Sequence, residues 1–166
     1  MATILNTNGD NLQIPAPESA EFTFHIVTAA WNPAVTHALR DGAKETLLKA
    51  GIKKSAICLH DVAGTVELVN AAAAIRKAAE PSAVIIIGCV IRGDTPHFDY
   101  VCLQAAQGTA IMNADGGTPV IFGVLTVDNL EQAQQRAGGI LGNKGSEAAC
   151  AAIEMANLHH RLKKTE

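Results

Sequence analysis

The chain has 166 residues, of which 48% are hydrophobic and 17% charged, and its formal net charge is −3. This length suits one domain with an adequate hydrophobic core, and the slight acidity gives no electrostatic reason to expect DNA, RNA or an anionic membrane surface as a partner. The longest apolar run, Ala83–Ile91, is too short to cross a bilayer, and no basic and apolar leader opens the chain, so we expect neither a membrane span nor a secretion signal.

Residues 1–20 are polar, contain two prolines and show no helical period. They are typical of an N-terminal arm, and residues 21–166 then form a single domain. Within the arm, the segment Asn11–Ile14 is a candidate edge strand, either on this subunit or on a neighbouring one.

Strands alternate with helices from Phe22 onward. Asn32 is predicted to cap the first helix, with Pro33 at its first position and Gly51 at its end. The pattern of the first half predicts, in order, a strand over Phe22–Thr28, a helix over residues 33–50, a strand over Ser55–Val62, and a helix from Val66 to about Ala79 after a turn at Gly64-Thr65.

The second half continues the alternation. Thr95 is predicted to cap a helix that has Pro96 at its first position, and Asp128 and Glu131 have the spacing of a capping box. The predicted elements are a strand over Ala83–Ile91, a helix from Thr95 to about Asn113, a strand over residues 119–126, a short helix through Arg136, a loop over Gly138–Asn143, and a helix from Ser146 to about Lys163.

Four apolar strands that alternate with helices indicate a parallel sheet covered on both faces. The sequence therefore predicts an α/β fold with three layers. The four cysteines, at positions 58, 89, 102 and 150, show no CxxC pair and no metal-ligand spacing. We expect no metal site, and reduced thiols in a cytoplasmic protein.

The segment Arg92–Tyr100 directly follows the longest apolar strand. The carboxyl edge of such a strand is where open α/β sheets place their ligands, and the exposed N–H groups of a helix start favour an anion. His97 is the side chain there that can transfer protons near neutral pH. A structural or surface histidine is the alternative interpretation.

Other strand ends carry further candidates, each with a simpler explanation. Trp31 can stack on a planar ring, although packing between helices is the interpretation that composition favours. Glu67 either accepts hydrogen bonds from ligand hydroxyls or only stabilises a helix start. Arg136 either clamps a phosphate or compensates a helix dipole, and Lys144 is a second loop cation or a solvated side chain.

These segments together resemble the lumazine synthase family over about Phe24–Leu158. The motifs that carry the resemblance are Gly64-Thr65-Val66-Glu67-Leu68, the run Val90–Val101 with its Arg-Gly-x-Thr-x-His-Phe-Asp-Tyr pattern, Phe122-Gly123-Val124-Leu125-Thr126, and Asn143-Lys144-Gly145. Two positions and one loop depart from the usual pattern: Ala63 replaces a common proline, Cys89 a frequent threonine, and Gly139–Leu141 a more polar loop.

The resemblance implies a flavodoxin-like fold and condensation of 5-amino-6-(D-ribitylamino)uracil with 3,4-dihydroxy-2-butanone 4-phosphate. The products are 6,7-dimethyl-8-ribityllumazine, phosphate and water, and the reaction uses no cofactor and no metal. The resemblance further implies assembly at least to a pentamer. A decamer and a hollow icosahedral shell of sixty subunits stay open, with riboflavin synthase as a candidate protein partner.

Site roles follow from the same resemblance. The residues implied to bind the pyrimidine and its ribityl chain are Trp31, Thr65, Val66, Glu67, Cys89, Val90, Ile91 and Phe122. Those implied to bind the phosphate are Asp94, Thr95 and Arg136, with Lys144 as a nearby cation. His97 is implied to transfer protons, while Phe122 and Arg136 are implied to reach the site from a neighbouring subunit.

Two rival functions stay open. One is an archaeal-type riboflavin synthase, which has a related fold and acts on the lumazine product. The fuller match to the segment Arg92–Asp99 argues against it. The other is a non-catalytic shell protein that binds lumazine or flavin, and the presence of Glu67, His97 and Arg136 argues against that.

Overall fold

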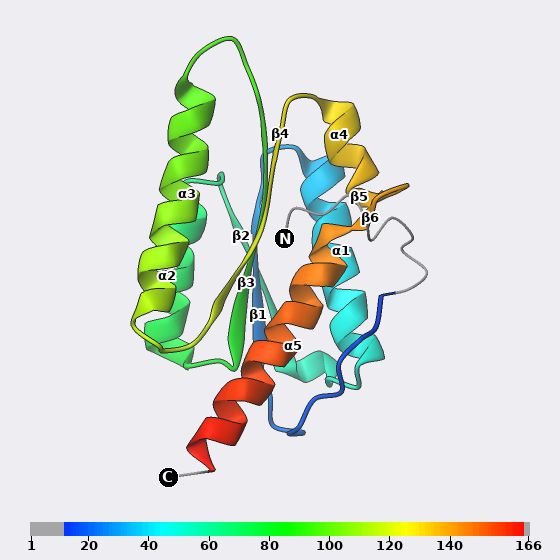
Figure 1. Cartoon of the computed structure of the whole chain (residues 1–166), viewed down its shortest axis with the longest axis vertical. Helices are drawn as coiled ribbons and strands as arrows, with labels where there is room; N and C mark the ends of the chain where they lie inside the picture. Colours follow the sequence, from blue (N-terminus) through cyan, green and yellow to red (C-terminus); the bar gives the residue numbers. More distant parts are fainter. Residues whose placement is uncertain (1–11, 165–166) are drawn as a thin grey trace.

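The computed structural model describes residues 12–164, which form a central β-sheet with helices on both faces (Figure 1). In chain order the elements are β1 (Phe24–Ala29), α1 (Pro33–Lys49), the 3-10 turn η2 (Lys54–Ala56), β2 (Ile57–Val62), α2 (Glu67–Ala79), β3 (Ala83–Ile91), α3 (His97–Ala114), β4 (Val120–Val127), α4 (Leu130–Gln135), β5 (Ala137–Gly139), β6 (Gly142–Asn143) and α5 (Lys144–Lys163).

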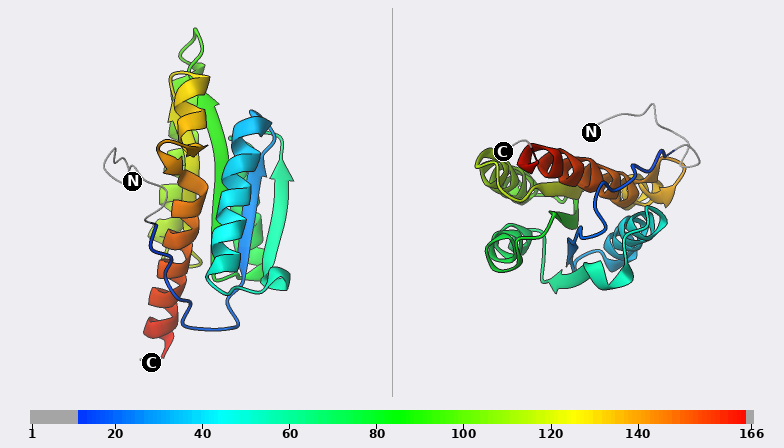
Figure 2. Two further views of the ribbon diagram at one scale, coloured as in Figure 1. Left: turned by 90° about the vertical axis from the view of Figure 1, so that its right-hand side faces the viewer. Right: turned by 90° about the horizontal axis from the view of Figure 1, so that it is seen from below.

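The strands β1 to β4 form one parallel sheet in the order β2-β1-β3-β4. Helices α2 and α3 cover one face, and α1 and α5 cover the other, as the views of Figure 2 also show. This arrangement confirms the predicted flavodoxin-like α/β/α fold with a four-stranded parallel sheet. It leaves β2 and β4 as the two edges.

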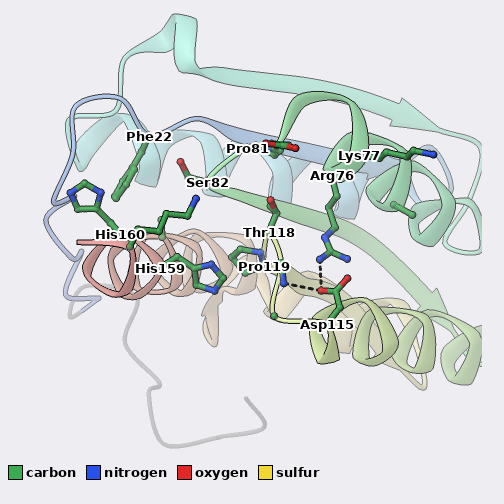
Figure 3. Close-up of a pocket in the computed structure, with 16 residues that line it drawn as sticks. Phe22, Arg76, Lys77, Pro81, Ser82, Asp115, Thr118, Pro119, His159 and His160 are labelled. Carbon is green, nitrogen blue, oxygen red and sulfur yellow. Dashed lines mark hydrogen bonds and ion pairs between the residues drawn. The ribbon is translucent and has the colours of Figure 1, made fainter. Parts of the chain in front are cut away.

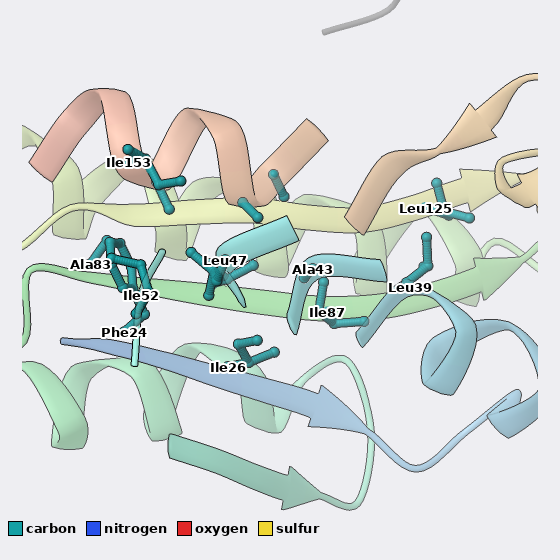
Figure 4. Close-up of a cluster of buried hydrophobic side chains, with 14 of the residues drawn as sticks. Phe24, Ile26, Leu39, Ala43, Leu47, Ile52, Ala83, Ile87, Leu125 and Ile153 are labelled. Carbon is teal, nitrogen blue, oxygen red and sulfur yellow. The ribbon is translucent and has the colours of Figure 1, made fainter. Parts of the chain in front are cut away.

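The core lies on both sides of β3, the strand that the long apolar run forms. Its first seven residues are buried. Ile85 and Ile87 join a cluster with side chains of α1 and α5, shown in part in Figure 4, whereas Val84 and Ile86 join a cluster with α2 and α3. A strand covered on both faces needs apolar side chains at every position, so its sequence is a continuous apolar run.

The start of α3 differs from the prediction by one residue. Pro96 occupies the N-cap position, the helix begins at His97, and no side chain caps it. The prediction that Thr95 caps the helix is therefore wrong. The reason is a tight turn in which the N–H of Asp99 donates to the Pro96 carbonyl at 2.9 Å, so that Pro96 already has helical dihedral angles.

The predicted capping box of α4 is also displaced by one residue. Asn129 is the N-cap, and its side chain accepts from the N–H of Gln132 at 2.9 Å. The Gln132 side chain in turn accepts from the N–H of Asp128 at 3.0 Å. Asp128 does not cap the helix because its carboxylate accepts from Arg92 Nε at 3.2 Å.

Helix α1 begins at Pro33 as predicted, but Asn32 does not cap it through its side chain. Asn32 has a left-handed backbone, with φ 57°, and its side-chain amide donates to the Cys89 carbonyl at 2.9 Å. The amide thus joins the end of β1 to the end of β3. Gly51 follows the helix with φ +93°, in agreement with its predicted role.

Residues 138–143 form part of a small antiparallel hairpin, β5–β6, where the sequence predicted a loop. Helix α5 follows it directly and begins at Lys144, two residues before the predicted start. The cause is Asn143, whose side-chain oxygen accepts from the N–H groups of Gly145 at 2.8 Å and Ser146 at 3.2 Å. The remaining element bounds lie within two residues of the prediction.

The last part of the predicted arm is fixed against α5. The Asn157 side chain donates to the Ala16 carbonyl at 2.9 Å and accepts from the Glu18 N–H at 2.8 Å. Residues 12–17 form no helix or strand within this chain, and Asn11 lies outside the described residues. Pairing of the arm with a neighbouring subunit stays a prediction.

Two histidines of adjacent strands form a hydrogen-bonded pair. His25 Nδ1 of β1 lies 3.0 Å from His60 Nε2 of β2, and the two rings are inclined by only 21°. One ring must donate and the other accept, so the bond fails when both rings are protonated. Burial and the neighbouring His60 lower the pKa of His25 from 6.5.

This pair predicts that the protein loses stability in mild acid. Because the folded-state pKa of His25 is lowered, the unfolded chain binds more protons, and the contribution present above pH 6.5 is lost as the pH falls through the folded-state value. We expect the urea concentration at the unfolding midpoint, followed by circular dichroism, to be lower at about pH 5.5 than at about pH 7.5. This decrease should be smaller in His25→Gln. The exposed His37 provides the matched control, His37→Gln. An unchanged pH dependence in His25→Gln would contradict the assignment.

Candidate active site

The candidate residues from three strands gather at the carboxyl edge of the sheet, the upper end in Figure 1. Trp31 follows β1, the segment Thr65–Glu67 follows β2, and Cys89–Ile91 end β3. In a parallel sheet all strand ends of one kind meet at the same edge, which is where such folds bind ligands.

The Trp31 ring and the Glu67 carboxylate both lie beside Gly64. A Cβ at Gly64 would lie 3.3 Å from Cδ1 of Trp31 and 3.2 Å from Oε2 of Glu67. Trp31 is 72% exposed, so the interpretation that it packs between helices is wrong. The indole and the Glu67 carboxylate are therefore both accessible to a ligand beside Gly64.

The turn that precedes α2 is held from two sides. The Thr65 side chain is buried against β3, where a Cβ at Gly88 would lie 3.0 Å from Thr65 Oγ1. The carbonyl of Val66 accepts from Gln104 Nε2 of α3 at 3.3 Å. The position of Glu67, at the start of α2, is thus set by both β3 and α3.

At the end of β3, the backbone is better suited to contact a ligand than the side chains are. Burial raises the pKa of the Cys89 thiol to about 11, so this thiol is protonated near neutral pH. Val90 and Ile91 are half-buried and pack on opposite faces of the sheet. At Cys89 the thiol is thus unsuited to ionic contacts, and the main-chain carbonyl already accepts from Asn32.

The entry to α3 is open to solvent. Asp94, Thr95 and His97 are all exposed. They lie at the N-terminus of a helix of 18 residues, whose first N–H groups have no partner within the helix. This end of α3 suits an anion, with the His97 imidazole beside it.

Phe122 lies away from this group within the same chain. It pairs with Ile86 in the sheet, whereas Cys89 pairs with Leu125. Phe122 therefore lies three residues before the level of Cys89, away from the carboxyl edge. It also belongs to β4, the edge strand farthest from β2, which corresponds to about 14 Å across three strand spacings. Its side chain is exposed on that edge.

Arg136 and Lys144 lie together near the hairpin. Arg136 is the C-cap of α4, and its Nη1 donates to the Gln132 carbonyl at 2.9 Å. The N–H of Lys144 donates to the Arg136 carbonyl at 2.9 Å. Lys144 is not a loop cation as predicted, because it opens α5 and binds both oxygens of Glu147 at 2.8 and 2.9 Å.

Apart from the α3 entry and Phe122, the candidate residues thus form two groups in one chain. Trp31, the turn to Glu67 and the ends of β3 belong to the first, and Arg136 and Lys144 to the second. Within residues 12–164, no hydrogen bond or ion pair joins the second group to the first. Asn32 and Gln104 hold parts of the first group through contacts that the sequence did not reveal, because their partners are distant in the chain.

A cavity of about 640 Å³ lies at the opposite end of the sheet (Figure 3). It is bordered by the C-terminal turns of α2 and α5 and by the segments that lead into β1, β3 and β4. Arg76 in its wall is bound to Asp115 at 2.6 Å and to the Met112 carbonyl at 3.0 Å. Basic side chains at helix C-termini compensate the helix dipoles, and the cavity is remote from the candidate site.

Within residues 12–164, no three His, Cys, Asp or Glu side chains come together as metal ligands would. None of the helices in this part of the chain is both long and apolar enough to span a membrane. The four cysteines are free thiols. Burial raises the pKa of Cys150 to about 11, so this thiol too is protonated near neutral pH.

The sequence matches a family model described as 6,7-dimethyl-8-ribityllumazine synthase over residues 21–160. A protein of that name from Phocaeicola vulgatus is 45% identical over 166 residues, which covers 100% of this chain and 99% of the relative. A Bacteroides fragilis protein of the same name is 50% identical over 85% of this chain and 99% of its own length. A third, from Porphyromonas gingivalis, is 46% identical over 95% and 98%.

Proposed function

The chain belongs to the 6,7-dimethyl-8-ribityllumazine synthase family, and we infer that it catalyses the condensation that this name describes. Its substrates are then 5-amino-6-(D-ribitylamino)uracil and 3,4-dihydroxy-2-butanone 4-phosphate. The observation that carries the inference is the meeting of Trp31 and Glu67 at Gly64, on the carboxyl edge of the sheet. A ring and a hydroxylated chain are what these two side chains can bind.

The first group of candidate residues binds the pyrimidine substrate in this proposal. Trp31 stacks on the ring, and Glu67 accepts hydrogen bonds from ribityl hydroxyls. Thr65 and Val66 line the turn beside them. The backbone of Cys89, Val90 and Ile91 provides donors and acceptors for the polar edge of the pyrimidine.

The entry to α3 and the second group bind the phosphate substrate. Asp94 and Thr95 contribute N–H groups, since an Asp94 carboxylate would repel a phosphate and has to face away from it. Arg136 contributes a guanidinium that suits phosphate geometry. Lys144 adds charge near Arg136, although Glu147 balances part of it.

His97 moves the protons of the reaction. The ring amine attacks the ketone, and water leaves as the C=N bond forms. The C–O bond to phosphate then breaks as the neighbouring carbon, which carries a hydroxyl, loses a proton. The resulting enol takes up a proton at its terminal carbon and becomes a methyl ketone. The ribitylamino nitrogen attacks this ketone and closes the second ring with loss of water. Each step needs a proton given or taken near neutral pH, which an imidazole can do, while the phosphate site stabilises the leaving group.

The site is completed by a second subunit in this proposal. Phe122, Arg136 and Lys144 lie away from the Trp31–Glu67 group in their own chain, which is expected if they serve a neighbour. Helix α3 carries the exposed apolar side chains Tyr100, Leu103 and Ile111, whose spacing places them on one face. Such a face is suited to packing against other subunits, and a pentamer is the assembly that we propose.

Larger assembly and cellular context are further parts of the proposal. The tip of the β5–β6 hairpin exposes Ile140, which is 74% accessible and could form an apolar contact between pentamers. A shell of sixty subunits would use such contacts, and light scattering separates it from a decamer or a free pentamer by mass. Riboflavin synthase consumes the lumazine product and is the protein partner that we propose. The proposed location of this protein is the cytoplasm.

Two incubations test the function against its rivals. With both substrates, we expect lumazine absorbance to rise and phosphate to be released in equal amount, at a rate proportional to protein. With lumazine alone, we expect no riboflavin. Riboflavin formation would indicate the archaeal-type riboflavin synthase instead. Tight lumazine binding without turnover of either substrate set would indicate the non-catalytic shell protein.

A further inference from the structure

Arg92 lies at the meeting point of three elements. It directly follows β3, and its N–H donates to the Val127 carbonyl at the end of β4, at 2.8 Å. Its side chain donates from Nε to Asp128 at 3.2 Å and from Nη1 to Asp99 at 3.3 Å. Its guanidinium carbon also lies 4.0 Å from the centre of the Phe98 ring.

These contacts make Arg92 a bridge across the turn that leads into α3. The turn, residues 93–96, separates Arg92 from His97, and the Arg92 side chain reaches over it to Phe98 and Asp99 in the first turn of the helix. A Cβ at Gly93 would meet no atom within 4 Å. The Arg92 side chain therefore ties the turn to the helix, together with the bond from the Asp99 N–H to the Pro96 carbonyl.

The same side chain begins a path to Arg136. Asp128 accepts from Arg92, the N–H of Asp128 donates to the Gln132 side chain, and the Gln132 carbonyl accepts from Arg136. Three hydrogen bonds therefore link Arg92 to Arg136 at the end of α4, and a fourth, from Arg92 to Asp99, links Arg92 to the start of α3, which carries His97.

We propose that Arg92 is a positioning residue that fixes two phosphate-binding elements of its own chain. One is the turn at Asp94-Thr95, which serves this chain's site, and the other is the Arg136 guanidinium, which in the proposed assembly serves the neighbouring subunit's site. The inference rests on the proposed function, because it assigns Arg92 to the phosphate half of that site. Arg92 does not itself bind the phosphate. Two carboxylates of its own chain and the Phe98 ring occupy its guanidinium.

The test compares Arg92→Gln and Arg92→Lys with wild type in the lumazine assay. We expect Arg92→Gln to raise the KM of dihydroxybutanone phosphate and to lower kcat/KM for it by about tenfold, because displaced groups lose catalytic alignment. The KM of the pyrimidine substrate is expected to stay unchanged. Arg92→Lys keeps the charge but not the fork of donors, and should recover only part of the loss.

A second variant tests the path to Arg136. Asp128→Asn should reproduce part of the Arg92→Gln effect. The double variant should have the same kcat/KM for dihydroxybutanone phosphate as Arg92→Gln alone, because both changes break the same Arg92–Asp128 interaction. Arg40→Gln is the matched control, because Arg40 is also paired with an aspartate, Asp41, but lies on α1. It should leave both KM values unchanged.

Three results would overturn the proposal. The first is an Arg92→Gln enzyme with unchanged kinetics. The second is a change of both KM values by the same factor, and the third is fully additive effects of Arg92→Gln and Asp128→Asn. Wild-type protein that makes no lumazine would instead refute the proposed function itself. Circular dichroism and solution mass of each variant establish that the fold and the assembly are kept.

Discussion

The variant Arg136→Ala is expected to lose about 100- to 1000-fold in kcat/KM for dihydroxybutanone phosphate, the usual cost of removing one preorganised donor from a developing charge. The guanidinium is half-buried at the end of α4, where Nη1 is held by the Gln132 carbonyl at 2.9 Å. Its other N–H groups can then meet two phosphate oxygens with little loss of freedom. Initial rates of lumazine formation at saturating pyrimidine substrate measure the effect.

Two further variants serve as comparisons for Arg136→Ala. Arg136→Lys should fall between wild type and Arg136→Ala, because a lysine keeps the charge and loses the second donor. Gln135→Ala, one residue earlier in the chain, should have near wild-type kinetics. If Arg136 only compensates the dipole of α4, Arg136→Ala will shift the unfolding midpoint slightly and leave kcat/KM unchanged, which would refute its assignment to the site.

The variant Gly145→Ala is expected to have the largest effect on stability, a loss of about 3 kcal/mol or more in the free energy of unfolding. A Cβ at Gly145 would lie 1.9 Å from the Leu39 carbonyl oxygen and 2.6 Å from its carbon. Both atoms belong to the backbone of α1, so no side chain can move aside. Relief requires α5 to separate from α1, and both helices bury core residues such as Leu47 and Ile153.

Two other glycines provide graded controls for this measurement. At Gly42, a Cβ would lie 2.4 Å from the Asn143 side chain, which can rotate at the cost of its capping bonds, so Gly42→Ala should lose less than Gly145→Ala. A Cβ at Gly93 would meet no atom within 4 Å beyond its chain neighbours, and Gly93→Ala should change stability by less than about 1 kcal/mol. Urea unfolding gives the order of the free energies of unfolding of the three variants. Soluble yield ranks any variant that is too unstable to purify. Equal stability of Gly145→Ala and Gly93→Ala would contradict the close packing of the two helices.

The sheet was predictable because its central strands, β1 and β3, are largely buried. An uninterrupted apolar run such as Ala83–Ile91 has one simple explanation in an α/β fold, and β3 has the predicted bounds. The convergence of Trp31 and Glu67 followed from the same logic, since both come directly after parallel strands. Local signals with one strong meaning, such as Gly51 after α1, were also reliable.

The features that sequence reasoning missed depend on distant partners. Asp128 has the spacing of a helix cap, but Arg92, 36 residues earlier, binds its carboxylate, and Asn129 caps α4 instead. Asn32 likewise bonds across the sheet to Cys89. The β5–β6 hairpin is only five residues in its two strands and contains three glycines, a composition that favours a loop. In each case a tertiary contact outweighs the local preference.

The proposal that two subunits share one site has a direct test. Neither His97→Ala nor Arg136→Ala should be fully active alone, although His97→Ala should keep measurable turnover from substrate positioning. Subunits of the two variants are mixed by co-refolding, and lumazine formation is compared with the sum of the separate activities. We expect about a quarter of the sites in a random mixture to contain both native side chains, and the activity to rise accordingly. A mixture no more active than that sum would show that His97 and Arg136 do not meet across subunits.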